Sequence, residues 1–201
     1  MNIVVFFSGT GTNLQSILQN EEKLNYKVIS TFTNNPDASG IDISKNFNVD
    51  CKILDHKKFD SREKFDEEIN IYLQKLNPDY VILAGYMRIL SNFLVEKWKQ
   101  KIINIHPSLL PKYPGLNTHE RAIHNKEKFS GCTVHFVNSK LDSGKIIIQK
   151  KVKINKKRPQ NKPRSNFIFI KFKTSFKSNV SSRIMCEFKL GIPAFELIRH
   201  K

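Results

Sequence analysis

The sequence predicts an α/β fold built on a doubly wound, mostly parallel sheet. Short apolar stretches alternate with amphipathic helical stretches through the first half of the chain. The opening stretch, residues 2–7, is apolar after Asn2, which is typical of a strand buried on both faces. Two strand-like stretches joined by a turn come later, at residues 131–137 and 144–154, and we expect them to be antiparallel.

A glycine-rich loop follows the first strand. Residues 8–13 read Ser-Gly-Thr-Gly-Thr-Asn, and Leu14, Ile17 and Leu18 then recur at helical spacing. Such a loop presents backbone N–H groups and neutral side-chain donors to an anion, so it predicts a phosphate site. It is neither a dinucleotide fingerprint, because Leu14 replaces the third glycine, nor a P-loop, because it lacks the lysine. A tight turn without a ligand is the alternative.

The alternation of strand and helix continues after this loop. Residues 28–32 and 49–54 predict strands, residues 34–37 a turn and residues 38–47 a helix. We therefore expect these strands to join the parallel sheet.

A longer helix is expected to begin near Asp60-x-x-Glu63, which resembles a capping box. Its apolar face would comprise Phe65, Ile69, Tyr72, Leu73 and Leu76. Arg62 lies in the first turn, where a positive charge opposes the helix dipole. It is interpreted either as a contact for a ligand carboxylate or as a solvated surface charge.

A second candidate ligand loop follows the next predicted strand. Residues 79–84 predict a strand that ends in the loop 85–90, and residues 93–98 and 101–104 predict a helix and another strand. Ligands of doubly wound sheets bind at the carboxyl ends of the strands. The loop 85–90 is therefore a candidate ligand-binding segment.

Asn104 and His106 follow, two residues apart. In an extended segment, residues i and i+2 point to the same side, so both side chains can face one reacting atom. The amide suits a developing oxyanion and the imidazole suits proton transfer, a pairing that favours acyl transfer. Pro107 and Pro111 stop the strand, and Ser108 is expected to brace the turn. A satisfied loop pair without catalysis is the alternative.

Asp142 is the only acidic residue between Glu127 and Glu187. Near His106, its carboxylate would hold the imidazole and stabilise the protonated ring. An ordinary turn residue is the alternative. Between the two regions, Thr118 is expected to cap a helix that runs to about His124.

Composition limits the classes of function. Lys and Arg outnumber Asp and Glu by 34 to 18, but residues 1–150 carry 20 basic and 16 acidic side chains, whereas residues 151–201 carry 14 and 2. The excess that would indicate a nucleic-acid partner thus lies in the tail. The three cysteines show no metal-ligand or disulfide spacing, and no apolar run approaches a membrane span. We expect a cytoplasmic protein without a signal peptide.

Four segments together resemble the folate-dependent glycinamide ribonucleotide formyltransferases of purine biosynthesis. They are residues 8–14, residues 84–90, residues 104–119 and the stretch Leu141-Asp142-x-Gly144. The resemblance covers about residues 1–154.

The resemblance implies a Rossmann-like formyltransferase fold. The amine of glycinamide ribonucleotide would attack the formyl carbon of 10-formyltetrahydrofolate. Asn104 would steady the oxyanion, protonated His106 would move protons to the leaving nitrogen, and Asp142 would keep His106 protonated. The residues that match the substrate-phosphate loop are Gly11, Thr12 and Asn13, and those that match the folate contacts are Arg62, Met87, Arg88, Ile89, Leu90 and Asn104. No metal is implied, and a monomer or homodimer is expected.

Two related enzymes fit the sequence less well. Methionyl-tRNA formyltransferase lacks the phosphate loop and usually has an Arg-Gly pair in place of Lys112-Tyr113-Pro114-Gly115. Formyltetrahydrofolate deformylase has an extra amino-terminal domain, for which Met1-Asn2-Ile3 leaves no room.

The tail differs from the resembled family. We expect a catalytic domain at residues 1–155 and an atypical basic tail at residues 156–201, in which the family's long final helix is not recognisable. Two origins are considered. Either the tail is a genuine part of the protein, ordered or disordered, or the reading frame has slipped in a run of adenines. Sequencing the gene across residues 150–161 would distinguish them. Without the family's helix, we expect low stability and little activity.

A non-catalytic binding protein is the alternative from a different class. Phenylalanines interleave with lysines at residues 167–177, a pattern that suits single-stranded nucleic acid. Salt-dependent binding would identify it, but it leaves the catalytic set unexplained.

Overall fold

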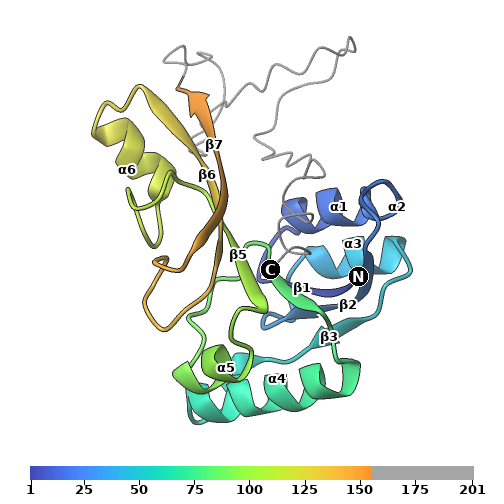
Figure 1. Cartoon of the computed structure of the whole chain (residues 1–201). Coiled ribbons are helices and arrows are strands. Elements are labelled where there is room, and N and C mark those ends of the chain that lie inside the picture. Colours follow the sequence, from blue (N-terminus) through green and yellow to red (C-terminus); the bar gives the residue numbers. More distant parts are fainter. Residues whose placement is uncertain (155–201) are drawn as a thin grey trace.

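The opening apolar run forms β1 (Asn2–Phe7), which lies inside a seven-stranded sheet of order β3-β2-β1-β4-β5-β6-β7 (Figure 1). The computed structural model describes residues 1–154. The other strands are β2 (Lys27–Thr33), β3 (Cys51–Ile53), β4 (Tyr80–Leu83), β5 (Ile102–His106), β6 (Phe129–Phe136) and β7 (Ile146–Lys153). The helices are α1 (Thr12–Leu18), α2 (Glu21–Leu24), α3 (Gly40–Asn46), α4 (Arg62–Leu76), α5 (Asn92–Lys97) and α6 (Thr118–His124), with a 3₁₀ helix η1 (His56–Lys58).

The strand pairing confirms the predicted fold class. The strands β3, β2, β1, β4 and β5 run parallel to their neighbours, whereas β6 pairs antiparallel with β5 and with β7. From β1 the chain first builds outward to β2 and β3, and then returns to the other side of β1 to form β4. In doubly wound sheets, ligands bind in the crevice outside such a reversal, here at the carboxyl ends of β1 and β4.

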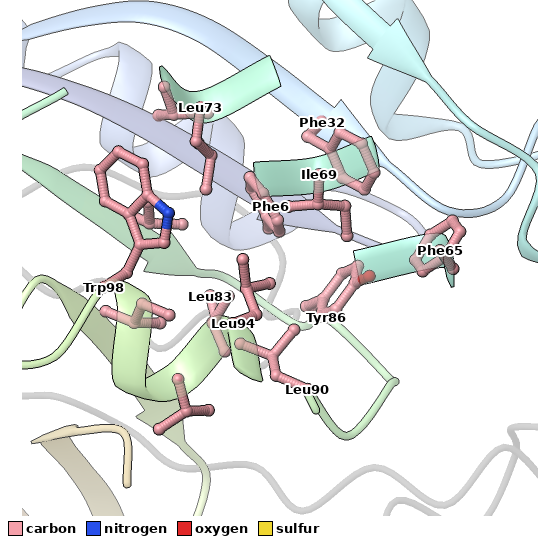
Figure 2. Packing of buried hydrophobic residues seen from close by; sticks show 14 residues of the cluster. Phe6, Phe32, Phe65, Ile69, Leu73, Leu83, Tyr86, Leu90, Leu94 and Trp98 are labelled. Atoms are coloured by element: carbon pink, nitrogen blue, oxygen red, sulfur yellow. The ribbon is translucent and has the colours of Figure 1, made fainter. Parts of the chain in front are cut away.

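Alternating residues of β1 divide the core into two layers. Val4 and Phe6 pack with α4 and α5, while Val5 and Phe7 pack on the opposite face with α1. All of these side chains are at most 1% exposed, as expected for a strand covered on both faces. Figure 2 shows the first layer, in which Phe6 stacks on Phe32 at 4.4 Å between ring centroids. Helices on both faces therefore hold the strands whose ends carry the candidate site.

Two predicted helix starts are wrong by one residue. The cap of α4 is Ser61, whose hydroxyl accepts the Lys64 N–H, whereas Asp60 forms an exposed ion pair with Lys64. Asn117 precedes α6, and Thr118 instead donates its hydroxyl to the Pro107 carbonyl. The Asp60 and Thr118 side chains thus have other partners, and Asn117 makes no side-chain cap hydrogen bond.

Some boundaries also differ from expectation. The strand β3 is shorter than residues 49–54, and β5 extends beyond residues 101–104 to His106, so that Pro107 is what ends it. The helix α2 and the turn η1 were not predicted, because their short sequences lack a clear apolar period. Within residues 1–154, none of the helices has the length and apolar character that crossing a bilayer requires. The expected tail, residues 156–201, lies outside the described residues.

Candidate active site

The strand β5 carries Asn104 and His106 to the carboxyl edge of the sheet. Because β5 lies between β4 and β6, Asn104 is paired in register with Leu83 on one side and His135 on the other. His106 is 4% exposed and Asn104 is half-buried. Extended backbone places the two side chains on the same side, as the spacing predicts.

The His106 ring faces a hydrogen-bond acceptor at each nitrogen. Its Nε2 donates to the carbonyl oxygen of Tyr113 at 2.9 Å, since a carbonyl can only accept. Its Nδ1 lies 3.4 Å from Oδ2 of Asp142. An acceptor oxygen therefore lies beside each ring nitrogen, and one of the two belongs to a carboxylate.

The Asp142 side chain contacts several groups of the site. Its side chain is 7% exposed, Oδ2 accepts the Gly115 N–H at 2.7 Å, and Oδ1 lies 3.3 Å from the Asn104 amide nitrogen. Burial raises the pKa of Asp142, but hydrogen bonds from His135 and Gly115 and the charges of the two histidines outweigh burial and lower it. The carboxylate is therefore held in its ionised form beside His106.

Buried hydroxyls brace the loop that holds His106. Ser108 donates to the Lys112 carbonyl at 2.6 Å, the bracing role that the sequence predicts. Thr133 donates to the Ser108 carbonyl at 2.6 Å and accepts the Leu110 N–H at 3.1 Å. These bonds fold the proline-bounded loop back, so that the Tyr113 carbonyl reaches His106.

A cavity of about 490 Å³ opens beside these residues. Asn104, His106 and Asp142 are polar groups in its lining, and most of the rest is apolar, including Leu83, Leu90 and Val137. A mostly apolar cavity of this size with a few convergent polar groups is typical of a site for an organic ligand. Among residues 1–154, no group of His, Cys, Asp and Glu side chains is arranged to hold a metal ion.

The predicted folate-contact loop forms one wall of the cavity. Met87, Arg88, Ile89 and Leu90 all line it, and Met87 and Ile89 are 68% and 57% exposed. The Arg88 guanidinium lies 5.1 Å from the centroid of the Phe65 ring. These side chains leave an apolar surface open to a ligand.

The remaining predicted contacts lie outside the cavity lining. Arg62 is exposed in the first turn of α4. Burial raises the pKa of the nearby Asp66, and the positive charge of Arg62 lowers it by a smaller amount. Gly11 and Thr12 lie at the start of α1, where the Thr10 and Thr12 hydroxyls are 3.1 Å apart. The cavity thus gathers the predicted catalytic residues and one predicted ligand loop, but not the phosphate loop.

Two histidines of the site were missed. His135 is 2% exposed, and its Nε2 lies 3.3 Å from the Asn104 amide nitrogen and 3.6 Å from Oδ1 of Asp142. A histidine within an apolar strand was a usable signal, but its place opposite Asn104 requires the strand register. His119 also lines the cavity; burial and the charge of His106 lower its pKa, and its Nδ1 has no hydrogen-bond partner among residues 1–154.

Comparison with known proteins agrees with this geometry. Residues 1–164 match the family model described as formyl transferase. The chain is 44% identical over 156 residues to phosphoribosylglycinamide formyltransferase of Escherichia coli (strain K12), covering 77% of this chain and 74% of that protein. It is 40% identical to the trifunctional purine biosynthetic protein adenosine-3 of Drosophila melanogaster, covering 76% of this chain and 12% of that longer protein. The crystal structure of glycinamide ribonucleotide transformylase 1 from Symbiobacterium toebii superposes with a TM-score of 0.75 at 38% identity, covering 78% of this chain and 74% of that one.

Proposed function

The chain belongs to the formyl transferase family, and from that premise we propose that it transfers a formyl group from 10-formyltetrahydrofolate to the amine of glycinamide ribonucleotide. The observation that carries the proposal is the convergence of Asn104, His106 and Asp142 on one side of an apolar cavity. Several similar proteins are named for this same transfer, so other folate-dependent reactions of the fold are not favoured.

The cavity suits the heteroaromatic part of a folate. Its wall at residues 85–90 offers apolar side chains and main-chain polar groups, which can contact a flat ring from one side. The folate supplies an activated formyl group when it is bound. We assign Met87, Arg88, Ile89 and Leu90 to the ring and exposed Arg62 to a carboxylate at the other end of the molecule.

The polar residues can stabilise the reacting formyl group. The Asn104 amide can turn its N–H groups from Asp142, 3.3 Å away, to the oxygen on which negative charge develops. The Nδ1 atom of His106 is on the same side as Asp142, and its 3.4 Å separation from Oδ2 leaves the proton available to a ligand atom. Asp142 stabilises the imidazolium from which that proton is given.

The glycine-rich loop is proposed to hold the ribonucleotide phosphate. Gly11, Thr12 and Asn13 offer main-chain and side-chain donors without a fixed positive charge, which suits an anion that must be released after each turnover. The main-chain N–H of Ser8 donates to Gly85, so this loop begins beside the loop that walls the cavity. The phosphate and the folate would then lie on either side of the reacting atoms.

The test is the formyl-transfer rate of the His106→Ala protein. We expect kcat to fall by about 100-fold or more, because the imidazole acts on the transition state, while folate binding stays within several-fold of the parent. His124→Ala is the matched control, since His124 is an exposed residue at the end of α6, and it should keep the parent rate. A parent without formyl transfer would reject the proposed function, and a His106→Ala rate within about tenfold of the parent would reject the role of His106.

A further inference from the structure

Ser8 lies immediately after β1, at the crevice between β1 and β4, and all of its hydrogen-bonding groups are engaged. Its N–H donates to the Gly85 carbonyl at 3.1 Å, and its carbonyl accepts the Asn35 side-chain amide at 3.2 Å. Its hydroxyl donates to Oδ1 of Asn34 at 2.6 Å and accepts the Met87 N–H at 2.8 Å. One serine therefore joins the ends of β1, β2 and β4.

The direction of these bonds is determined by the chemistry of the partners. The Met87 main-chain N–H can only donate, so the Ser8 oxygen must accept there and use its single proton on Asn34. Asn34 is 4% exposed, and its own carbonyl accepts from Nδ1 of His56 at 2.9 Å. The Ser8 hydroxyl is thus hydrogen-bonded to the buried Asn34 on one side and to the exposed loop 85–90 on the other.

Two loops of the proposed site share this attachment. The glycine-rich loop starts at Ser8 and is exposed at Gly9 and Thr10. The wall of the cavity is attached to Ser8 through Met87, whose side chain is 68% exposed. Neither ligand has to touch the Ser8 hydroxyl for its loop to depend on it.

We propose that Ser8 is a positioning residue that couples the two substrate subsites. A ligand that orders either loop also fixes Ser8, so the second ligand has less conformational freedom left to remove and binds more tightly. By linkage, each substrate strengthens the other by the same factor. The inference rests on the proposed function, because it takes the two loops as the folate and ribonucleotide subsites.

The test measures binding by calorimetry with the full chain. The probes are glycinamide ribonucleotide and tetrahydrofolate, which lacks the formyl group, so no turnover occurs. Each Kd is determined with and without a saturating amount of the other ligand. For the parent we expect each ligand to lower the Kd of the other about five-fold or more. For Ser8→Ala we expect each ligand to lower the Kd of the other by less than about two-fold.

Two further variants keep the test decisive. Ser30→Ala is the matched control: Ser30 is a buried serine of β2 whose hydroxyl donates to the Asp50 carbonyl at 2.8 Å, and this variant should keep the parent coupling. Asn34→Ala removes the acceptor of the Ser8 proton and should lose coupling like Ser8→Ala. Melting temperatures of all variants show that they are folded.

The possible outcomes distinguish a failure of the coupling role of Ser8 from a failure of the proposed function. If the parent binds both ligands and Ser8→Ala keeps the same coupling, the role of Ser8 is refuted. Independent binding of the two ligands to the parent refutes it equally. A parent that binds neither ligand overturns the proposed function and the inference with it.

Discussion

At the scale of single residues, the candidate site depends on which acceptors surround each polar group. His106 meets the Tyr113 carbonyl and the Asp142 carboxylate, and Asp142 in turn meets the Gly115 N–H. Main-chain groups of Tyr113 and Gly115 orient the two side chains, whereas the Asp142 carboxylate supplies the negative charge beside the imidazole. Substitution of the carboxylate should therefore affect the reaction more than the fold.

Asp142→Asn should lower kcat by about 100-fold or more. The amide is close in size to the carboxylate but carries no charge, so the imidazolium of His106 loses its anionic neighbour. The acidic limb of the parent's pH–rate profile, where the Asp142 carboxylate takes up a proton, should also be missing from the variant. The control is Asp60→Asn, which removes an exposed carboxylate paired with Lys64. An unchanged profile would remove Asp142 from the mechanism.

Tyr86→Phe should raise the free energy of unfolding by about 1 kcal/mol. Tyr86 is 9% exposed among Phe6, Phe32 and Phe65, and its hydroxyl has no hydrogen-bond partner among residues 1–154 (Figure 2). Burying this oxygen without a partner lowers the free energy of unfolding, and phenylalanine avoids that cost while filling the same space. Urea titrations of the two proteins measure the difference, and a clear decrease in stability would mean that the hydroxyl is satisfied.

At the scale of elements, the contact between the glycine-rich loop and α3 determines the shape of the proposed phosphate site. Gly11 has a positive φ of 72°, and a Cβ there would lie 2.7 Å from the Gly40 Cα. Gly40 in turn donates its N–H to the Gly9 carbonyl at 3.0 Å. The loop therefore needs a glycine at position 11 for its packing, whether or not it binds an anion.

Gly11→Ala should lower the free energy of unfolding by about 1 to 3 kcal/mol in the absence of ligands. Both the left-handed backbone and the approach to Gly40 oppose a methyl group. Gly9→Ala is the matched control, because a Cβ at Gly9 meets no atom within 4 Å. Thermal unfolding of the two variants measures the effect, and equal melting temperatures would show that the loop adapts without loss.

At the scale of the whole molecule, the sheet brings distant segments to one edge. His106 lies at the end of β5, and the segments before and after β6 bring Tyr113 and Asp142 to the two nitrogens of its ring. Titration of a residue at such a junction therefore affects the stability of the complete fold.

The free energy of unfolding of the parent should exceed that of Asp142→Asn by less in acid than at pH 7. The folded protein lowers the pKa of Asp142 below its ordinary value of 3.8, so the carboxylate contributes stability above that value, and this contribution is lost as the pH falls through the folded pKa. Groups remote from Asp142 titrate alike in both proteins and cancel in the comparison. Urea unfolding between pH 7 and the acid range measures it. A difference that does not change with pH would contradict the lowered pKa.

The sequence alone determined most of the elements, although not α2 or η1, and it identified the candidate residues. Apolar runs, helical periods and turn residues act between near neighbours, which is why β1, α4 and the loop 85–90 were predicted close to their observed positions. It was also predictable that the Asn104 and His106 side chains face the same side, because side chains along a strand alternate with a period of two. Helix starts were less certain, because Ser61 and Asp60 are both able to cap.

Only the tertiary structure decided which distant groups meet. Asp142 reaches His106 because β6 and β7 pair antiparallel beside β5, and the same register brings His135 opposite Asn104. The Tyr113 carbonyl and the Gly115 N–H complete the site, yet every residue type carries such main-chain groups, so sequence cannot single them out. Local patterns specify elements, whereas contacts between remote segments arise from burial and strand pairing of the whole sheet.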